Sequence, residues 1–182
     1  MVVWITGRPA SGKTTLGLEL VAAFGRAGQK ATLVDSDEVR LHLTPQPTYG
    51  ADERALVYRA IAYAARRLSE EGILAVVAAT AHDEALRDAA RTICPGLFLI
   101  HARCAATTCE SRDPKALYRS ARARDSGSMP GVHVAWVDPI DADAEVDTAV
   151  KVEPARIEEL VARVMQLGVH ALHPPVPRSP PR

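Results

Sequence analysis

The chain has 182 residues, a length that suits a single α/β domain. Its 22 lysines and arginines balance 22 aspartates and glutamates, and aromatic residues make up only 4%. The chain therefore has neither the broad positive charge nor the aromatic residues for base stacking that are typical of a nucleic-acid-binding protein. No apolar run approaches the roughly 20 residues that cross a membrane, so we expect no membrane-spanning helix.

Strand-like and helix-like segments alternate along the chain. In chain order the patterns predict a strand at Val2–Thr6, a helix from Lys13 to about Ala27, a strand at Ala31–Val34, a helix from Asp52 to about Glu71, a strand at Ile73–Ala79, a helix at Asp83–Arg91, a strand at Leu97–His101, helical pieces at Thr107–Arg112 and Pro114–Arg122, a loop at Arg124–Val132 and a final helix at Pro154–Leu167. This order is typical of an α/β fold with a mostly parallel sheet and right-handed crossovers, in three α/β/α layers.

The proline content changes near the C-terminus. Residues 1–168 are predicted to form one domain, and residues 169–182 (VHALHPPVPRSPPR) a flexible tail, because repeated prolines interrupt helices.

Residues 7–14 read GRPASGKT and match the phosphate-binding pattern GxxxxGK[ST]. The match follows a buried strand and opens a helix, which is the context the motif requires. Glycines let backbone N–H groups approach phosphate oxygens, and the helix N-terminus favours the anion. Lys13 is predicted to reach the β- and γ-phosphates of ATP, and the Thr14 hydroxyl to bind Mg²⁺. The expected nucleotide-binding residues of the loop are Gly7, Arg8, Pro9, Ala10, Ser11, Gly12, Lys13, Thr14 and Thr15.

Two carboxylates follow the second predicted strand, in the segment LVDSDEVR. Asp35 and Asp37 would lie at the carboxyl edge of the sheet, where parallel-sheet proteins bind ligands. There they can position Mg²⁺ or accept a proton from an attacking hydroxyl, so we expect Lys13, Asp35 and Asp37 to be catalytic and Thr14 and Asp35 to hold the metal. Which aspartate is the base stays open, and either could instead cap the next helix. Arg40 is placed to meet an anionic substrate.

A basic stretch, ESRDPKALYRSARAR, follows residue 109. At helical spacing Lys115, Arg119 and Arg122 would share one face, with Arg112 just before it. Such a segment can close as a lid over phosphates, although a solvated charged face has the same pattern. Arg112 and Lys115 are the expected nucleotide contacts of the lid.

Three of these segments together resemble the adenylylsulfate (APS) kinase family, from Val2 to about Thr148. WITGRPASGKTT looks like its phosphate-binding loop, VDSDEVR is similar to its DGDNVR segment, and CESRDPKALYRSAR closely matches CExRDPKGLYKKAR. The resemblance implies a P-loop NTPase fold with a lid, Mg²⁺, and transfer of the ATP γ-phosphate to the ribose 3′-hydroxyl of adenylylsulfate. It also implies a homodimer and a substrate role for Arg54.

The chain departs from this family on the acceptor side. Val57 replaces the asparagine of the DRxxN segment, residues 80–84 (TAHDE) replace ISPFR, and residues 127–131 (GSMPG) replace KGFTG. We expect a small-molecule, nucleotide-like acceptor whose contacts are Asp37, Arg40, Arg54, Thr80, His82, Arg119 and Met129. A different nucleotide acceptor, such as cytidine diphosphoramidate, and a regulatory nucleotide-binding module without phosphotransfer are the alternatives.

The remaining polar and sulfur-containing residues carry less information. His82 could equally be a surface histidine, and Trp136 could cover the pocket or simply pack. The three cysteines, Cys94, Cys104 and Cys109, lack the spacing of a disulfide framework or zinc site, which indicates free thiols. With no visible signal peptide, this predicts a cytoplasmic protein.

Overall fold

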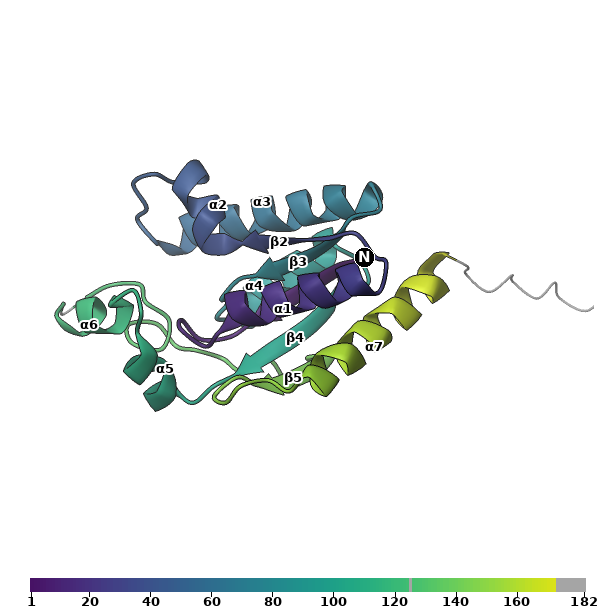
Figure 1. Ribbon diagram of the computed structural model, residues 1–182. Coiled ribbons are helices and arrows are strands. Elements are labelled where there is room, and N and C mark those ends of the chain that lie inside the picture. The colour runs from purple at the N-terminus through teal and green to yellow at the C-terminus, as the bar shows by residue number, and fades with distance from the viewer. Residues whose placement is uncertain (125, 173–182) are drawn as a thin grey trace, which may run out of the picture.

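The computed structural model describes residues 1–124 and 126–172, which form a three-layer α/β/α domain (Figure 1). The sheet has the order β2-β3-β1-β4-β5, and every neighbouring pair is parallel. Its strands are β1 (Val2–Thr6), β2 (Ala31–Asp35), β3 (Leu74–Ala78), β4 (Phe98–Arg103) and β5 (Ala144–Asp147). The predicted fold class is confirmed.

Helices cover both faces of the sheet. In the described residues they are α1 (Lys13–Arg26), α2 (Ser36–Leu43), α3 (Ala51–Glu70), α4 (Glu84–Ile93), α5 (Ala106–Arg112), α6 (Leu117–Arg122) and α7 (Pro154–Leu172). Figure 1 shows α1 and α7 on one face and α3 and α4 on the other, while α5 and α6 lie beyond the carboxyl end of β4. None of these helices, within the described part of the chain, has the length and apolar character needed to cross a membrane.

The alternation of side chains along β1 explains the two core layers. Val3 and Ile5 join the cluster under α1 and α7, whereas Val2 and Trp4 join the cluster under α3 and α4. Since both faces of the strand are buried, its sequence is a continuous apolar run rather than an alternating one.

The parallel topology brings three strand ends to one edge of the sheet. β3 lies between β1 and β2, and Asp35, the last residue of β2, pairs in register with Ala78 of β3. The loop after β1 and the carboxylates after β2 therefore flank the end of β3.

Several predicted boundaries were wrong. The edge strand β5 was not anticipated, and the short helix α2 was considered only as the helix that Asp35 or Asp37 could cap. The helix expected from Pro114 begins only at Leu117, because Ala116 adopts a left-handed conformation with φ of 52°. The last helix runs to Leu172, so Gly168 is helical and the first residues of the predicted tail continue the helix. The proline-rich remainder, residues 173–182, lies outside the described residues.

Candidate active site

The loop between β1 and α1 has the backbone conformation that a phosphate cradle needs. Gly12 has φ of 92° and Ala10 has φ of 59°, both left-handed. The amide of Ser11 donates to the carbonyl of Arg8 at 3.1 Å and closes the turn. A Cβ atom on Gly7 would lie 2.6 Å from Ser11 Oγ and 2.7 Å from a backbone carbonyl oxygen of β4. Only glycine fits at this position without a shift of the backbone.

Lys13, the first residue of α1, folds back over this loop. Its Nζ donates to the carbonyl oxygens of Gly7 at 3.0 Å and of Arg8 at 2.8 Å. Burial lowers the pKa of Lys13 to about 8, against the opposing effect of Asp37 and Asp35. The ammonium group is thus held against the loop by two neutral carbonyl oxygens. A phosphate oxygen, which is charged and accepts a stronger hydrogen bond, can replace them.

Thr14 and Asp35 come together at the carboxyl edge of the sheet. The Thr14 hydroxyl donates to Asp35 Oδ2 at 2.6 Å, and Asp35 Oδ1 accepts from the amide of Asp37 at 2.8 Å. Asp35 therefore does cap α2, while its second oxygen faces the phosphate-binding loop. In the described residues no group of three or more His, Cys, Asp and Glu could hold a metal ion. A hydroxyl and one carboxylate nevertheless fit Mg²⁺, which takes most of its remaining ligands from phosphates and water.

Asp37 faces the lid rather than Thr14. Its Oδ2 lies 2.6 Å from Lys115 Nζ, and both side chains are about three-fifths exposed, at 61% and 60%. The hydrogen bond to Asp37 raises the pKa of Lys115. The two aspartates, whose roles the sequence pattern did not distinguish, therefore have different partners: Asp35 bonds Thr14, and Asp37 bonds Lys115.

The lid is attached to the loop by Tyr118 of α6, whose hydroxyl donates to the carbonyl of Pro9 at 3.1 Å. Arg112 donates to the carbonyl of Ala149 at 2.6 Å and lies about 4.0 Å from the position of a Cβ on Gly12. Arg112 therefore lies close to the phosphate-binding loop. Thr15 is exposed in the first turn of α1.

The predicted basic face of the lid was wrong. Since α6 starts late, Lys115 is outside the helix, and Arg122 pairs with Glu110 of α5 at 2.6 Å. Arg119 lines a cavity of about 260 Å³ together with Arg112. Among the described residues it makes no hydrogen bond or ion pair with the expected acceptor residues of α2 and α3.

Two buried arginines, Arg40 of α2 and Arg54 of α3, form a second surface of the site, called the acceptor wall below. Arg40 of α2 pairs with Glu53 of α3 at 2.8 Å, with both side chains mostly buried. Arg54 donates to the carbonyl of Tyr49 at 3.2 Å and to that of Ser128 at 2.8 Å. Arg54 thereby joins α3 to the segment that follows the lid.

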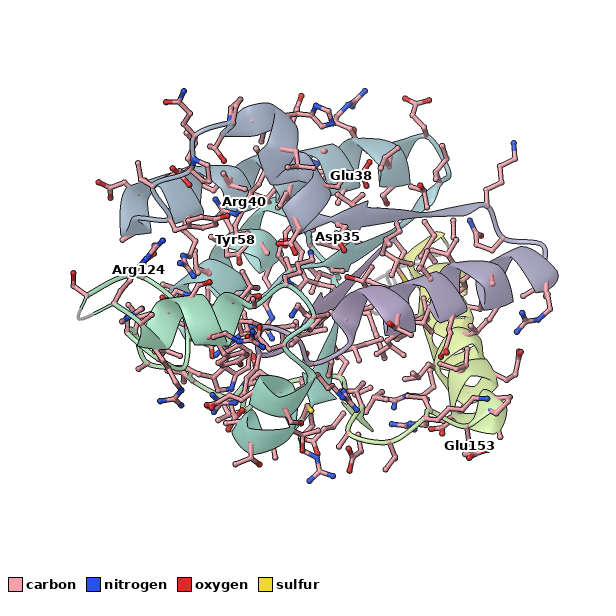
Figure 2. The ribbon with its side chains drawn as sticks, turned by 60° about the vertical axis from the view of Figure 1, so that its left-hand side comes forward. Asp35, Glu38, Arg40, Tyr58, Arg124 and Glu153 are labelled. Atoms are coloured by element: carbon pink, nitrogen blue, oxygen red, sulfur yellow. The ribbon has the colours of Figure 1, made fainter. Side chains whose placement is uncertain are left out.

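Two tyrosines of this wall escaped the sequence analysis. The ring of Tyr49 lies 5.2 Å from the guanidinium carbon of Arg40, and that of Tyr58 lies 6.0 Å away. Figure 2 shows Arg40 and Tyr58 next to each other below α2. Tyr49 has a left-handed backbone conformation, with φ of 54°. Because the residue is 46% exposed, part of its aromatic ring is accessible to a ligand at the acceptor wall. The position of Tyr49 in the segment PQPTYG gave no indication of its contact with Arg40.

The loop after β3 completes the acceptor wall. The carbonyl of Thr80 accepts from the Thr6 hydroxyl at 2.6 Å. His82 Nε2 lies 3.4 Å from Asp83 Oδ2, and its buried Nδ1 has no partner among the described residues. Burial, followed by the charge of Arg54, lowers the pKa of His82, so the ring is neutral at pH 7. A neutral histidine with one open nitrogen can accept or donate one hydrogen bond to a ligand.

Met129 and Trp136 belong to the segment after the lid. Met129 packs, with Ala10, against the small apolar cluster of Cys104, Cys109 and Tyr118. The Trp136 ring lies between elements far apart in sequence: it stacks on His101 at 6.3 Å, and the guanidinium of Arg8 lies 5.4 Å from its centre. The thiols of all three cysteines are free, as predicted, and all three residues are buried.

The phosphate-binding loop between β1 and α1, with Lys13 folded over it, is that of a P-loop protein. The Thr14–Asp35 pair beside the loop and the two buried arginines of α2 and α3 are features of a kinase in this class. A family model described as adenylylsulphate kinase matches residues 1–147. The chain therefore belongs to the adenylylsulphate kinase family.

Relatives and solved structures agree with this assignment. The chain is 33% identical over 147 residues to a probable adenylyl-sulfate kinase of Archaeoglobus fulgidus, covering 81% of this chain and 95% of that one. It is 31% identical over 169 residues to an adenylyl-sulfate kinase of Shewanella amazonensis, covering 92% and 85%. The Mycobacterium tuberculosis APS kinase in complex with AMPPNP and APS matches with a TM-score of 0.80 and 26% identity, covering 92% and 96%. A gluconokinase from Sinorhizobium meliloti, at 18% identity and a TM-score of 0.59, shares the fold alone.

Proposed function

We propose that this chain is an ATP-dependent kinase that transfers the γ-phosphate to the ribose 3′-hydroxyl of adenylylsulfate. The observation that carries the proposal is a phosphate-binding loop with Lys13 folded over it, close enough to Asp35 and Asp37 for their charges to act on its pKa. Two buried arginines, Arg40 and Arg54, lie on the neighbouring helices α2 and α3. The family membership narrows the acceptor to adenylylsulfate. Cytidine diphosphoramidate as acceptor, and a regulatory module without phosphotransfer, are not favoured by the relatives.

On the donor side, the backbone amides of residues 8–14 bind the β-phosphate and Lys13 binds the γ-phosphate. Lys13 exchanges its two carbonyl acceptors for phosphate oxygens. Thr14 and Asp35 would hold Mg²⁺, which when bound neutralises charge on the β- and γ-phosphates. Arg112 contributes a further positive charge from the lid.

Asp37 is the general base in this proposal. Asp35 is bonded to Thr14 and to the amide of Asp37 that it caps, whereas among the described residues the carboxylate of Asp37 is bonded only to the exposed Lys115. When Lys115 turns to the phosphates, Asp37 Oδ2 can accept the proton of the acceptor hydroxyl. The hydroxyl oxygen forms a bond to the γ-phosphorus, the bond from that phosphorus to the β–γ bridging oxygen breaks, and ADP leaves.

The acceptor lies against α2, α3 and the loop after β3. Arg54 and Arg40 provide positive charge, and the exposed ring of Tyr49 provides a face on which a base can stack. The lid excludes water, which would otherwise compete as acceptor.

A homodimer and a cytoplasmic location are part of the same proposal. ATP and reduced thiols are both typical of the cytoplasm, and the three buried cysteines are free. Light scattering coupled to size exclusion measures the oligomeric state, and a monomer at micromolar concentration would contradict the dimer.

The function is tested by coupling ADP release to a spectrophotometric assay. We expect turnover with ATP and adenylylsulfate, none above background without acceptor, and loss of turnover in Lys13→Met. Cytidine diphosphoramidate and adenosine 5′-phosphate serve as comparison acceptors. Equal rates with and without adenylylsulfate would refute the proposal.

A further inference from the structure

The side chain of Arg8 leaves the phosphate-binding loop while its backbone stays in it. Its carbonyl accepts from Lys13 Nζ at 2.8 Å. Its guanidinium carbon lies 5.4 Å from the centre of the Trp136 ring, and a Cβ on Gly131 would meet its Nη1 at 2.9 Å. The guanidinium therefore lies between the loop and the segment that follows the lid.

The charge of Arg8 is uncompensated. In the part of the chain that the structure describes, its guanidinium has the ring contact with Trp136 but no hydrogen bond or ion pair, although the residue is half-buried. Arg40, Arg54 and Arg112 differ, because each donates to a carboxylate or carbonyl. A guanidinium presents five donors in a planar fork that matches phosphate and sulfate oxygens, so an unpaired one here is available to an anion.

The aromatic partner of Arg8 is held in place before any ligand binds. Trp136 Nε1 donates to Asp138 Oδ1 at 2.6 Å, and the ring stacks on that of His101 with an angle of 27° between the planes. His101 is in turn buried, with Nδ1 at 3.4 Å from Glu145 Oε2. This support fixes the surface on which the guanidinium rests, as a preorganised binding site requires.

Arg8 also lines a cavity of about 370 Å³ with residues 131–136. The nucleotide-side residues Gly12, Thr14 and Arg112 do not line it. The segment that lines the cavity is instead bonded at both ends to residues of the acceptor side: Ser128 accepts from Arg54, and Val137 donates to the carbonyl of His82 at 2.9 Å. An occupant of this cavity would therefore belong to the acceptor side of the site.

We propose that Arg8 and Trp136 form an anion subsite that selects acceptors with a charged 5′ end. The guanidinium of Arg8 binds the oxygens of the terminal sulfate of adenylylsulfate, while Trp136 holds the guanidinium in position. The subsite rests on the function proposed above. An uncharged nucleoside leaves Arg8 unpaired and is bound less well.

The test compares Arg8→Met and Arg8→Lys with Arg26→Met, a matched control at an exposed arginine of α1 that pairs with Glu158. Arg8→Met should raise the KM for adenylylsulfate about 30-fold, the expected loss of a charge-assisted bidentate contact. kcat and the Kd of ADP should change less than about threefold, and Arg8→Lys should show an intermediate KM. Trp136→Leu should raise the same KM by a smaller factor, and Arg26→Met should match the wild type.

The outcomes separate the subsite from the overall function. If the wild type phosphorylates adenylylsulfate but Arg8→Met keeps its KM, the subsite is wrong and the function stands. If Arg8→Met weakens ADP as much as the acceptor, Arg8 belongs to the donor site and the subsite is again wrong. If the wild type does not phosphorylate adenylylsulfate, inorganic sulfate is titrated onto the ADP-bound protein and the melting temperature is followed. A rise in the wild type that is lost in Arg8→Met supports the subsite, and equal rises overturn it.

Discussion

Raising the pH from 7 to 9 should weaken the binding of ADP through loss of the proton on Lys13. In the free protein burial lowers the pKa of Lys13 to about 8. Bound phosphate oxygens favour the charged form and raise that pKa, so the complex keeps the proton across this range. The proton therefore promotes binding below pH 8, and its contribution is lost as the pH rises.

The size of the effect follows from the fraction of free protein that is protonated. With a pKa of about 8 this fraction falls from about nine-tenths at pH 7 to about one-tenth at pH 9, so the Kd of ADP should rise about tenfold. Two neighbouring groups have pKa values that lie above this window or are shifted upward. The pKa of Lys115 is raised by Asp37, and burial raises that of Cys109 to about 12.

Isothermal titration of ADP without Mg²⁺, at half-unit steps of pH, measures the dependence. The phosphate of the nucleotide itself titrates near pH 6, below the window. Lys13→Arg is the matched control, because a guanidinium keeps its charge throughout and its binding curve should be flat.

A wild-type Kd that stays constant between pH 7 and 9 would refute this reasoning. So would a Lys13→Arg variant with the same slope as the wild type, because another group would then carry the dependence.

Three further predictions concern single side chains. Asp37→Asn should lower kcat at least about 100-fold and leave the Kd of ADP within about threefold, since only the base is lost. If the variant turned over at the wild-type rate in the ADP-release assay, Asp37 would not be the general base. Gly7→Ala should destabilise the protein by about 1–3 kcal/mol in urea unfolding, because its Cβ would come within 2.7 Å of a carbonyl oxygen. Gly25→Ala, with no atom within 4 Å of its Cβ, is the control and should be neutral or stabilising by up to about 1 kcal/mol; equal losses would contradict the steric argument. Glu53→Gln should raise the KM for adenylylsulfate without affecting ADP, because Glu53 orients Arg40; an unchanged KM would show that Arg40 does not depend on it.

Most strands, the long helices and the phosphate-binding loop could be predicted because their signals are local. A buried strand followed by GxxxxGK[ST] carries its own backbone requirements within a dozen residues. The short elements α2 and β5 lacked such signals. The four residues of β5 alternate between buried and exposed at an edge of the sheet, so they show no apolar run.

The sequence indicated which residues belong to the candidate site, but it did not indicate which of them contact one another. Asp35 and Asp37 looked equivalent in the sequence, but one bonds Thr14 and the other pairs with Lys115, 78 residues away. Tyr49 was missed because a tyrosine in a turn gives no sign of the arginine it will contact.

The sequence by itself determined the donor half of this protein, since the geometry of the loop depends on glycines and a lysine within eight residues of one another. Only the tertiary structure decided the acceptor half, because that wall is assembled from α2, α3, the loop after β3 and the segment after the lid. Arg8 shows the division within a single residue. Its backbone position is set by the motif, whereas its side chain is directed by Trp136, which the fold brings to it from 128 positions further along the chain.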